Sequence, residues 1–188
     1  MFKDIKNVAP KAGENYFIDT NVWYFCTYAA SKDFFESSSQ PKQYQMEYYP
    51  TFVESAIENE AQLYCSALTL VELSTLIERS QWELYKSFYD LPNCRLKQFR
   101  KIDKEREEVI EEIKIAWETI MSMSSQLTFN IDEDMSDNFI KHIEKYEIDG
   151  YDALFYEMMD RLNISSVITD DKDFRQLKNL ITYTCYPD

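Results

Sequence analysis

Short apolar runs that stop at a polar residue and then lead into a helical pattern recur along this chain. Residues 16–18 (Tyr-Phe-Ile) end at Asp19, and a helical pattern follows. Similar short runs occupy residues 63–66, 166–169 and 181–183. Strands that are apolar on nearly every residue and alternate with helices indicate a parallel sheet covered on both faces. The sequence therefore predicts an α/β fold with helices on both sides of a central, mostly parallel sheet.

The length of 188 residues fits one domain with room for an insertion. Residues 1–15 show no apolar period, so we expect a flexible, loosely attached N-terminal arm followed by a single domain over residues 16–188. Residues 31–49, with the serine run at 37–39, suggest a loop. Residues 95–123 have apolar side chains at helical spacing and predict one long helix within a helical insertion around residues 81–130.

Several kinds of site are excluded by what the sequence lacks. Gly13 and Gly150 are the only glycines, so neither a dinucleotide-binding glycine motif nor a phosphate-binding P-loop can be present. A single histidine, His142, and four scattered cysteines argue against structural zinc. Neither a signal peptide nor a membrane span is expected from the hydropathy pattern, and cysteines of this kind favour a reducing compartment, so we expect a cytoplasmic protein.

Carboxylates stand where ligands gather in parallel sheets, just after the strands. Asp19 ends the first strand, Glu72 lies in the helix after the second, and Asp152 opens a later helix. Three more acids, Asp170, Asp171 and Asp173, follow the strand at residues 166–169. Converging carboxylates raise one another's pKa unless a cation neutralises them, and ligands that are all oxygen favour Mg²⁺ or Mn²⁺. Such a site predicts hydrolysis of phosphodiester bonds.

These segments resemble the motifs of PIN domains. Residues 16–22 (YFIDTNV) resemble the opening motif, residues 68–73 (LTLVEL) the helix with a glutamate, residues 151–154 (YDAL) the third acidic motif and residues 167–174 (VITDDKDF) the closing motif. The resemblance implies a PIN-like α/β/α sandwich and a metal-dependent endoribonuclease, a class that includes the toxins of VapC-type toxin–antitoxin pairs. It places the catalytic and metal-binding acids at Asp19, Glu72, Asp152 and Asp171, with Asp170 and Asp173 as further candidate ligands.

Some of these acids have a structural alternative. Glu72 could close a capping box with Thr69, and Asp149 could cap the helix that contains Asp152. Asp170 and Asp173 could belong to a solvated turn. Thr20 and Asn21 could cap the helix after Asp19, and they could also support the site by hydrogen-bonding an acid. We assign His142 no chemistry, because no second histidine or nucleophile accompanies it.

The net charge of −14 repels a polyanion such as RNA, so a nucleic-acid substrate needs cations or a local basic patch. The one dense basic segment supplies the candidate RNA-binding residues Arg95, Lys97, Arg100, Lys101 and Lys104. They serve this purpose only if they lie near the acids. The alternative is an ordinary solvated helix face.

We therefore predict a Mg²⁺- or Mn²⁺-dependent endoribonuclease acting on RNA, with an antitoxin protein and a second copy of the chain as candidate partners. One alternative is a nuclease that processes DNA or structured RNA. A second is a non-catalytic PIN-like scaffold, which the clustering of four acids disfavours because such a cluster is costly without a metal. A receiver-like phospho-acceptor is disfavoured because no suitably placed lysine follows a late strand.

Overall fold

The computed structural model describes the chain except for residues 33, 35–39 and 186–188. Its described residues form one sheet of six strands in the order β1-β6-β5-β2-β3-β4, and every pairing is parallel. The strands are β1 (Phe2–Asp4), β2 (Asn15–Ile18), β3 (Gln62–Ser66), β4 (Ser125–Leu127), β5 (Ser166–Ile168) and β6 (Ile181–Thr184). The expected α/β class with a central parallel sheet is confirmed.

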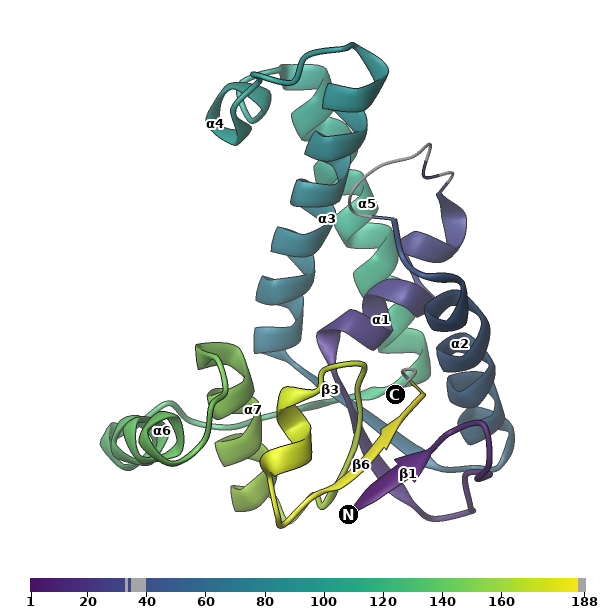
Figure 1. Cartoon of the computed structure of the whole chain (residues 1–188), viewed down its shortest axis with the longest axis vertical. Helices are drawn as coiled ribbons and strands as arrows, with labels where there is room; N and C mark the ends of the chain where they lie inside the picture. Colours follow the sequence, from purple (N-terminus) through teal and green to yellow (C-terminus); the bar gives the residue numbers. More distant parts are fainter. Residues whose placement is uncertain (33, 35–39, 186–188) are drawn as a thin grey trace.

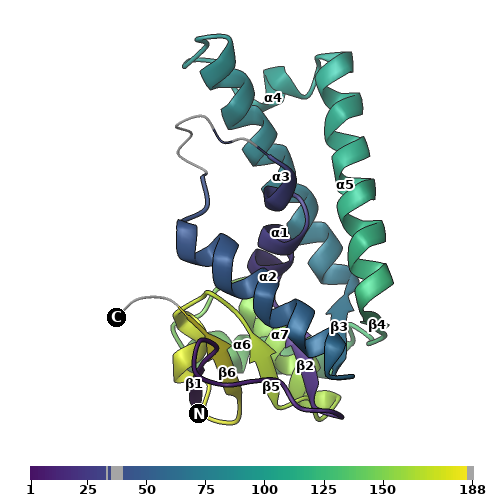
Figure 2. The same cartoon turned by 90° about the vertical axis from the view of Figure 1, so that its right-hand side faces the viewer.

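Helices cover both faces of the sheet (Figures 1 and 2). They are α1 (Thr20–Cys26), α2 (Gln43–Glu58), α3 (Ala67–Phe88), α4 (Leu96–Phe99), α5 (Asp103–Met123), α6 (Glu133–Lys145) and α7 (Gly150–Arg161), with short 3₁₀ turns η1 (Ala29–Ser31) and η2 (Asp173–Gln176). None of the described helices is long and apolar enough to cross a bilayer.

The central strand β2 shows how the sequence builds two cores. Successive side chains of a strand point to opposite faces. Tyr16 and Ile18 are fully buried in the core that β2 shares with α1, α2, α3 and α5. Phe17, between them, is buried in the other core and packs against Phe155 of α7 with ring centroids 5.1 Å apart. An uninterrupted apolar run is therefore what a strand between two helical layers requires.

The N-terminal residues depart from the expected loose arm. Phe2–Asp4 form the edge strand β1, which pairs with β6, and the Ile5 N–H donates to the Thr184 carbonyl at 3.0 Å. Ile5 itself is buried at 6% exposure. The sequence reasoning missed this strand because edge pairing uses backbone groups and needs no apolar period in the side chains.

Helices α3 and α5 form an antiparallel hairpin that projects from the sheet, and α4 lies near its outer end (Figures 1 and 2). The expected single helix over residues 95–123 is wrong, because the chain is extended at Ile102 between α4 and α5. The break turns Phe99 inward, where it is buried and its ring centroid lies 5.3 Å from that of Tyr85. In the region expected to be a loop, α2 begins at Gln43, and the serine run lies outside the described residues.

Candidate metal centre

The acids predicted from the sequence come together beyond the carboxyl ends of β2, β3 and β5. Asp19 follows β2 directly, Glu72 lies in the second turn of α3 after β3, and Asp171 follows β5. Asp152 joins them from the first turn of α7. Carboxylate oxygens of Asp152, Asp171 and Asp173 lie within 4.8 Å of one another. The charges of Asp19, Glu72 and Asp171 all act on Asp152, so the four segments form one electrostatic cluster, the acidic pocket.

Asp19 is held rigidly at the bottom of this pocket. It is 4% exposed, and its Oδ1 accepts the Thr20 N–H at 2.6 Å. Its Oδ2 accepts from Asn21 Nδ2 at 2.7 Å and from the Thr169 hydroxyl at 2.5 Å. Burial, together with the charges of Glu72 and Asp171, raises the Asp19 pKa to about 7, although the bonds from Thr169 and Thr20 oppose the shift. The carboxylate is oriented by its neighbours but not neutralised by them.

Glu72 has no structural role that accounts for its position. The capping box at the start of α3 is formed by Ser66 and Thr69, with the Ser66 N–H donating to the Thr69 hydroxyl at 3.1 Å, so Glu72 does not take the capping role that was its structural alternative. Among the described residues, Oε2 of Glu72 is buried without a hydrogen-bond partner. Burial, with the charges of Asp149 and Asp171, raises the Glu72 pKa. An unpartnered buried carboxylate oxygen is costly and calls for a cation.

Asp152 is the most strongly perturbed of these acids. It is 7% exposed, and burial and the charges of Asp19, Asp149, Asp171 and Glu72 raise its pKa to about 9. Asp149 has the structural role expected of it, because it caps α7 by accepting the N–H groups of Tyr151 and Asp152 at 2.8 and 3.1 Å. The positive end of α7 therefore faces two carboxylates, of which Asp152 points inward.

The three acids of the closing motif have different environments. Both carboxylate oxygens of Asp170 accept hydrogen bonds from α2, from Tyr44 at 3.0 Å, from Tyr49 at 2.7 Å and from Gln45. Asp171 is half-buried and its N–H donates to the Thr169 hydroxyl at 2.8 Å. Asp173 is exposed, and its N–H donates to Asp171 Oδ1 at 2.8 Å. Asp171 and Asp173 thus face the acidic pocket, whereas Asp170 ties the sheet to α2.

Two smaller side chains, Thr20 and Asn21, complete the pocket. Asp19, rather than Thr20 or Asn21, is the N-cap of α1, so the expected capping role of those two residues is wrong. Asn21 links two motifs, because its amide donates to Asp19 and its Oδ1 accepts the Asp170 N–H at 3.3 Å. The Thr20 hydroxyl lies near enough to Glu72 to favour its charged form, yet it forms no hydrogen bond to a described group.

Sequence reasoning missed Thr169 and Tyr49. Thr169 bridges Asp19 and Asp171 through its hydroxyl, and its place directly after a strand was the available signal. The Tyr49 hydroxyl also contacts the Thr169 carbonyl at 3.0 Å, and no local pattern marks that long-range contact.

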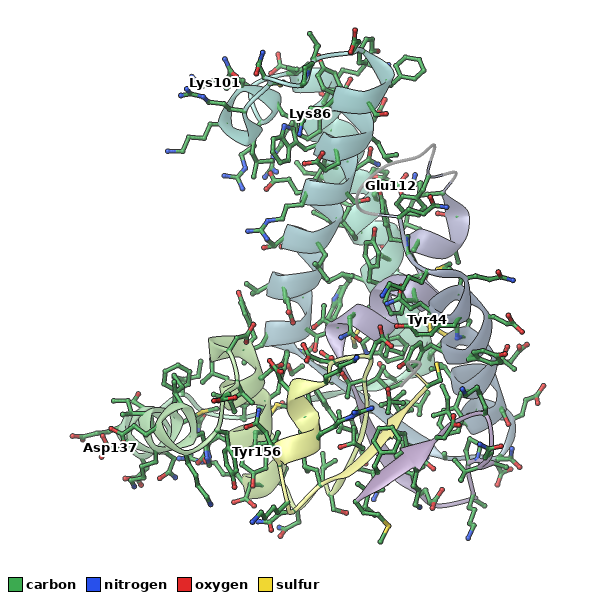
Figure 3. All side chains as sticks on the ribbon, in the orientation of Figure 1. Tyr44, Lys86, Lys101, Glu112, Asp137 and Tyr156 are labelled. Atoms are coloured by element: carbon green, nitrogen blue, oxygen red, sulfur yellow. The ribbon has the colours of Figure 1, made fainter. Side chains whose placement is uncertain are left out.

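The basic segment lies on the α3–α5 hairpin and not among the acids. Arg100 and Arg106 both pair with the buried Glu78 of α3, and Lys104 pairs with Glu108 at 3.6 Å. Arg95, Lys97 and Lys101 are exposed and have no ion pair with a described residue. Figure 3 shows Lys101 at the outer end of the hairpin.

Comparison with known proteins agrees with this geometry. The PIN domain family model matches residues 47–180, which is more than half of the chain and includes Glu72, Asp152 and Asp171. Asp19 precedes the matched region, and the structure places it beside the others, since its charge acts on Asp152. Among curated proteins there is no significant match.

A solved structure shares the fold. It is a chain of VapBC2 from Rickettsia felis bound to a DNA fragment from their promoter, with a TM-score of 0.50 and 14% identity over 92% of this chain and 99% of that chain. At this identity the likeness concerns the arrangement of helices and strands.

Proposed function

The chain belongs to the PIN domain family, and from this premise we propose that it is a nuclease, more narrowly a Mg²⁺- or Mn²⁺-dependent endoribonuclease that hydrolyses RNA phosphodiester bonds. The observation that carries the proposal is the acidic pocket, where carboxylates from four separate segments come together, Asp19 and Asp152 buried and Glu72 and Asp171 half-buried, without an ion pair to a described cation. We take residues 16–188 as the nuclease domain, extended by the edge strand β1, which pairs with β6. A cytoplasmic location, where RNA is accessible, fits the four free cysteines.

The residues present fit a divalent metal. Every candidate donor is a carboxylate oxygen, the donor type that Mg²⁺ and Mn²⁺ prefer. The unpartnered Oε2 of Glu72 is a buried acceptor that a cation would satisfy. Asp152 and Asp171 would hold the metal together with the exposed Asp173, since their carboxylate oxygens lie within 4.8 Å of one another. Asp19 and Glu72, whose charges act on Asp152, would complete the ligand set, and Asp170 is engaged with α2. When bound, the metal would neutralise the carboxylates, polarise the scissile phosphate and lower the pKa of water.

The protein contributes the orientation of the carboxylates and a low-dielectric setting. Thr169, Asn21 and the Thr20 N–H fix both oxygens of Asp19 before substrate arrives, which removes the cost of ordering them during the reaction. Burial raises the pKa of Glu72, so this residue would release its proton most readily when a cation binds at the unpartnered Oε2. Burial of this cluster excludes bulk water and strengthens the electrostatic interactions within it.

Cleavage of a mixed panel of RNA and single-stranded DNA tests this proposal. Wild type and Asp19→Asn would be compared in Mn²⁺, Mg²⁺ and EDTA. The proposal expects RNA cleavage by wild type that requires the metal and is lost in Asp19→Asn. Preferential cleavage of DNA would support a DNA-processing nuclease, and equal residual cleavage by both proteins would indicate contamination. Absence of cleavage under every condition would support a scaffold.

We also propose that the chain is the toxin of a toxin–antitoxin pair, with a protein antitoxin as its partner. The fold shared with the VapBC2 structure supports this assignment. Expression of the wild-type chain alone should stop growth of a bacterial host, and Asp19→Asn should not. Co-expression of the product of an adjacent gene should restore growth, and sedimentation of the purified chain would show whether it also forms a homodimer.

A further inference from the structure

The α3–α5 hairpin holds basic side chains at fixed distances from the acidic pocket, measured along the axis of α3. Segment 91–102 packs along α3 through three contacts. Arg100 pairs with Glu78, the Cys94 carbonyl accepts from Trp82 Nε1 at 3.0 Å, and Phe99 packs against Tyr85. These α3 residues follow Glu72 by six, ten and thirteen positions, which at ~1.5 Å per residue places them ~9, ~15 and ~20 Å along the helix axis.

The charge on this segment is unbalanced. Residues 91–102 contain four basic side chains and no acidic one, in a chain whose net charge is −14. Arg100 is committed to Glu78, a buried acid that already holds Arg106. Arg95, Lys97 and Lys101 are exposed and, within the described part of the chain, have no carboxylate within 4.0 Å. An uncompensated cation group on an acidic protein marks a site for a polyanion.

Arg79 extends this charge toward the pocket. It follows Glu72 by seven residues, or about two helical turns, so the two side chains lie on the same face of α3 about 10 Å apart along the axis. Arg79 is exposed and likewise has no ion pair with a described residue. In Figures 1 and 2, α4 lies above α7, whose first turn carries Asp152.

We propose that Arg79, Arg95, Lys97 and Lys101, which we call the hairpin cation track, bind the phosphate backbone of the RNA strand that leaves the acidic pocket. This inference rests on the proposed nuclease function and adds a second contact region to it. The track attracts the RNA phosphates that lie outside the acidic pocket. It thereby offsets the repulsion between the RNA and this acidic chain. The substrate must then extend about 10 to 20 Å from the scissile bond, and a shorter oligonucleotide misses the track.

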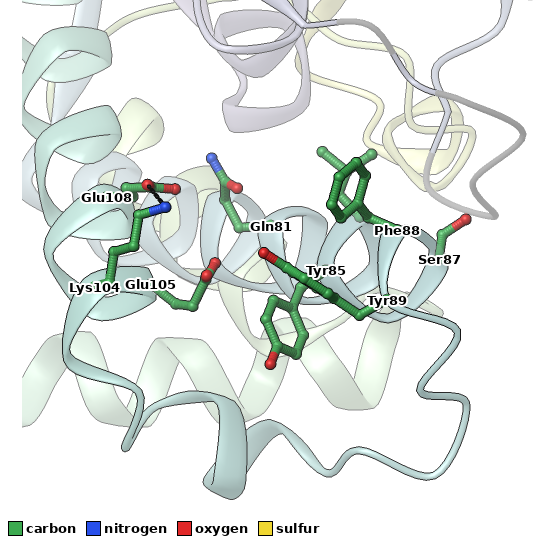
Figure 4. A pocket seen from close by; sticks show the side chains of 9 residues that line it. Gln81, Tyr85, Ser87, Phe88, Tyr89, Lys104, Glu105 and Glu108 are labelled. Atoms are coloured by element: carbon green, nitrogen blue, oxygen red, sulfur yellow. Dashed lines mark ion pairs between the residues drawn. The ribbon is translucent and has the colours of Figure 1, made fainter.

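The neighbouring cavity between α3 and α5 does not belong to the track. Tyr85, Phe88 and Tyr89 line it, but so do Glu105 and Glu108 (Figure 4). Lys104 also lines the cavity, but it pairs with Glu108 at 3.6 Å, so two carboxylates face one cation there and the cavity is unsuited to an RNA backbone.

Fluorescence anisotropy of labelled oligouridine in EDTA tests the track without any cleavage. The test variant is the triple substitution Arg95→Gln, Lys97→Gln and Lys101→Gln. The matched control, Lys114→Gln, Lys141→Gln and Lys178→Gln, removes the same charge from exposed lysines elsewhere. Loss of three phosphate contacts should lower the slope of log affinity against log salt by about 2. The affinity for oligouridine at low salt should fall about tenfold or more in the test variant and remain unchanged in the control.

The same variants separate the track from the nuclease proposal. With long RNA in Mn²⁺ the triple variant should show a raised KM with kcat retained, and with short RNA it should match wild type. Metal-dependent cleavage combined with an unchanged salt slope would overturn the track and leave the nuclease intact. Salt-dependent binding through the track without any cleavage would overturn the nuclease alone. If wild type fails to bind oligouridine in EDTA, the proposed track is wrong. It is also wrong if the triple variant keeps its affinity for RNA but no longer binds an acidic protein partner.

Discussion

The two buried carboxylates of α7 have opposite surroundings. Asp152 is 7% exposed and Glu157 is 3% exposed. Glu157 accepts from Asn138 at 2.9 Å and from Arg161 at 2.7 Å, and it contacts His142 at 2.9 Å. These partners outweigh burial and lower its pKa, whereas burial among other acids raises the Asp152 pKa to about 9.

This difference shows which buried acids indicate a metal-binding or catalytic site. Burial alone does not, because Glu157 is the more buried of the two and its hydrogen bonds join α6 to α7. A buried acid without hydrogen-bond donors or cations around it does indicate a functional site, because the folded chain gains nothing from the charge of Asp152 unless a ligand neutralises it. The following predictions test whether the two acids differ in this way.

The largest expected effect is on catalysis. Asp152→Asn should lower kcat/KM for RNA cleavage by about 10²-fold or more, because it removes a metal ligand. Glu157→Gln, whose site makes no contact with the pocket acids, should retain activity within a few-fold under conditions where it is folded. Equal losses in the two variants would contradict the division of roles.

The second effect is on stability. Glu157→Gln should lower the free energy of unfolding by about 2 kcal/mol, because Arg161 and its other partners lose a buried carboxylate. Denaturant unfolding measures this change, and Glu144→Gln on the exposed surface of α6 is the matched control with a change near zero. A Glu157→Gln protein as stable as the control would mean that the network stabilises nothing.

The third effect is an increase in stability rather than a loss. Without metal, Asp152→Asn should raise the free energy of unfolding at pH 8 by about 1 to 2 kcal/mol, because the wild-type chain must take up a proton at Asp152 to fold and the asparagine needs none.

The pH dependence follows from the same shift. The unfolded chain releases the Asp152 proton near its ordinary pKa of about 4, and the folded chain releases it only near pH 9. Wild type in EDTA should therefore lose stability as pH rises between these values, with a contribution from Asp19 up to about pH 7. Unfolding in EDTA at several pH values measures this trend, and an Asp152→Asn protein with the wild-type pH dependence would contradict it.

The smallest effect concerns the acid next to the pocket. Asp170→Asn should destabilise the chain by about 1 kcal/mol, because both oxygens of Asp170 accept hydrogen bonds from α2. It should leave metal affinity unchanged, whereas Asp171→Asn should weaken it. A loss of metal affinity in Asp170→Asn would show that Asp170 faces the pocket in the bound state.

The sequence was sufficient to predict the parallel sheet and the convergence of Asp19, Glu72 and Asp152, because short apolar runs and the acids after them are local patterns. It could not distinguish Asp170 from Asp171, since adjacent residues at a strand end point apart and the partners of Asp170 come from distant α2. The break at Ile102 follows from the burial of Phe99, a tertiary contact that helical periodicity does not reveal.

Calorimetric titration of Mn²⁺ at pH 7, in two buffers of different ionisation enthalpy, tests the central claim most directly. The account predicts that wild type binds Mn²⁺ and releases protons, because Asp152 is protonated in the metal-free chain at that pH. Glu157→Gln should behave like wild type, and Asp152→Asn should bind weakly with less proton release. Absence of binding to wild type, or identical titrations for wild type and Asp152→Asn, would contradict the claim that the acidic pocket is a metal centre.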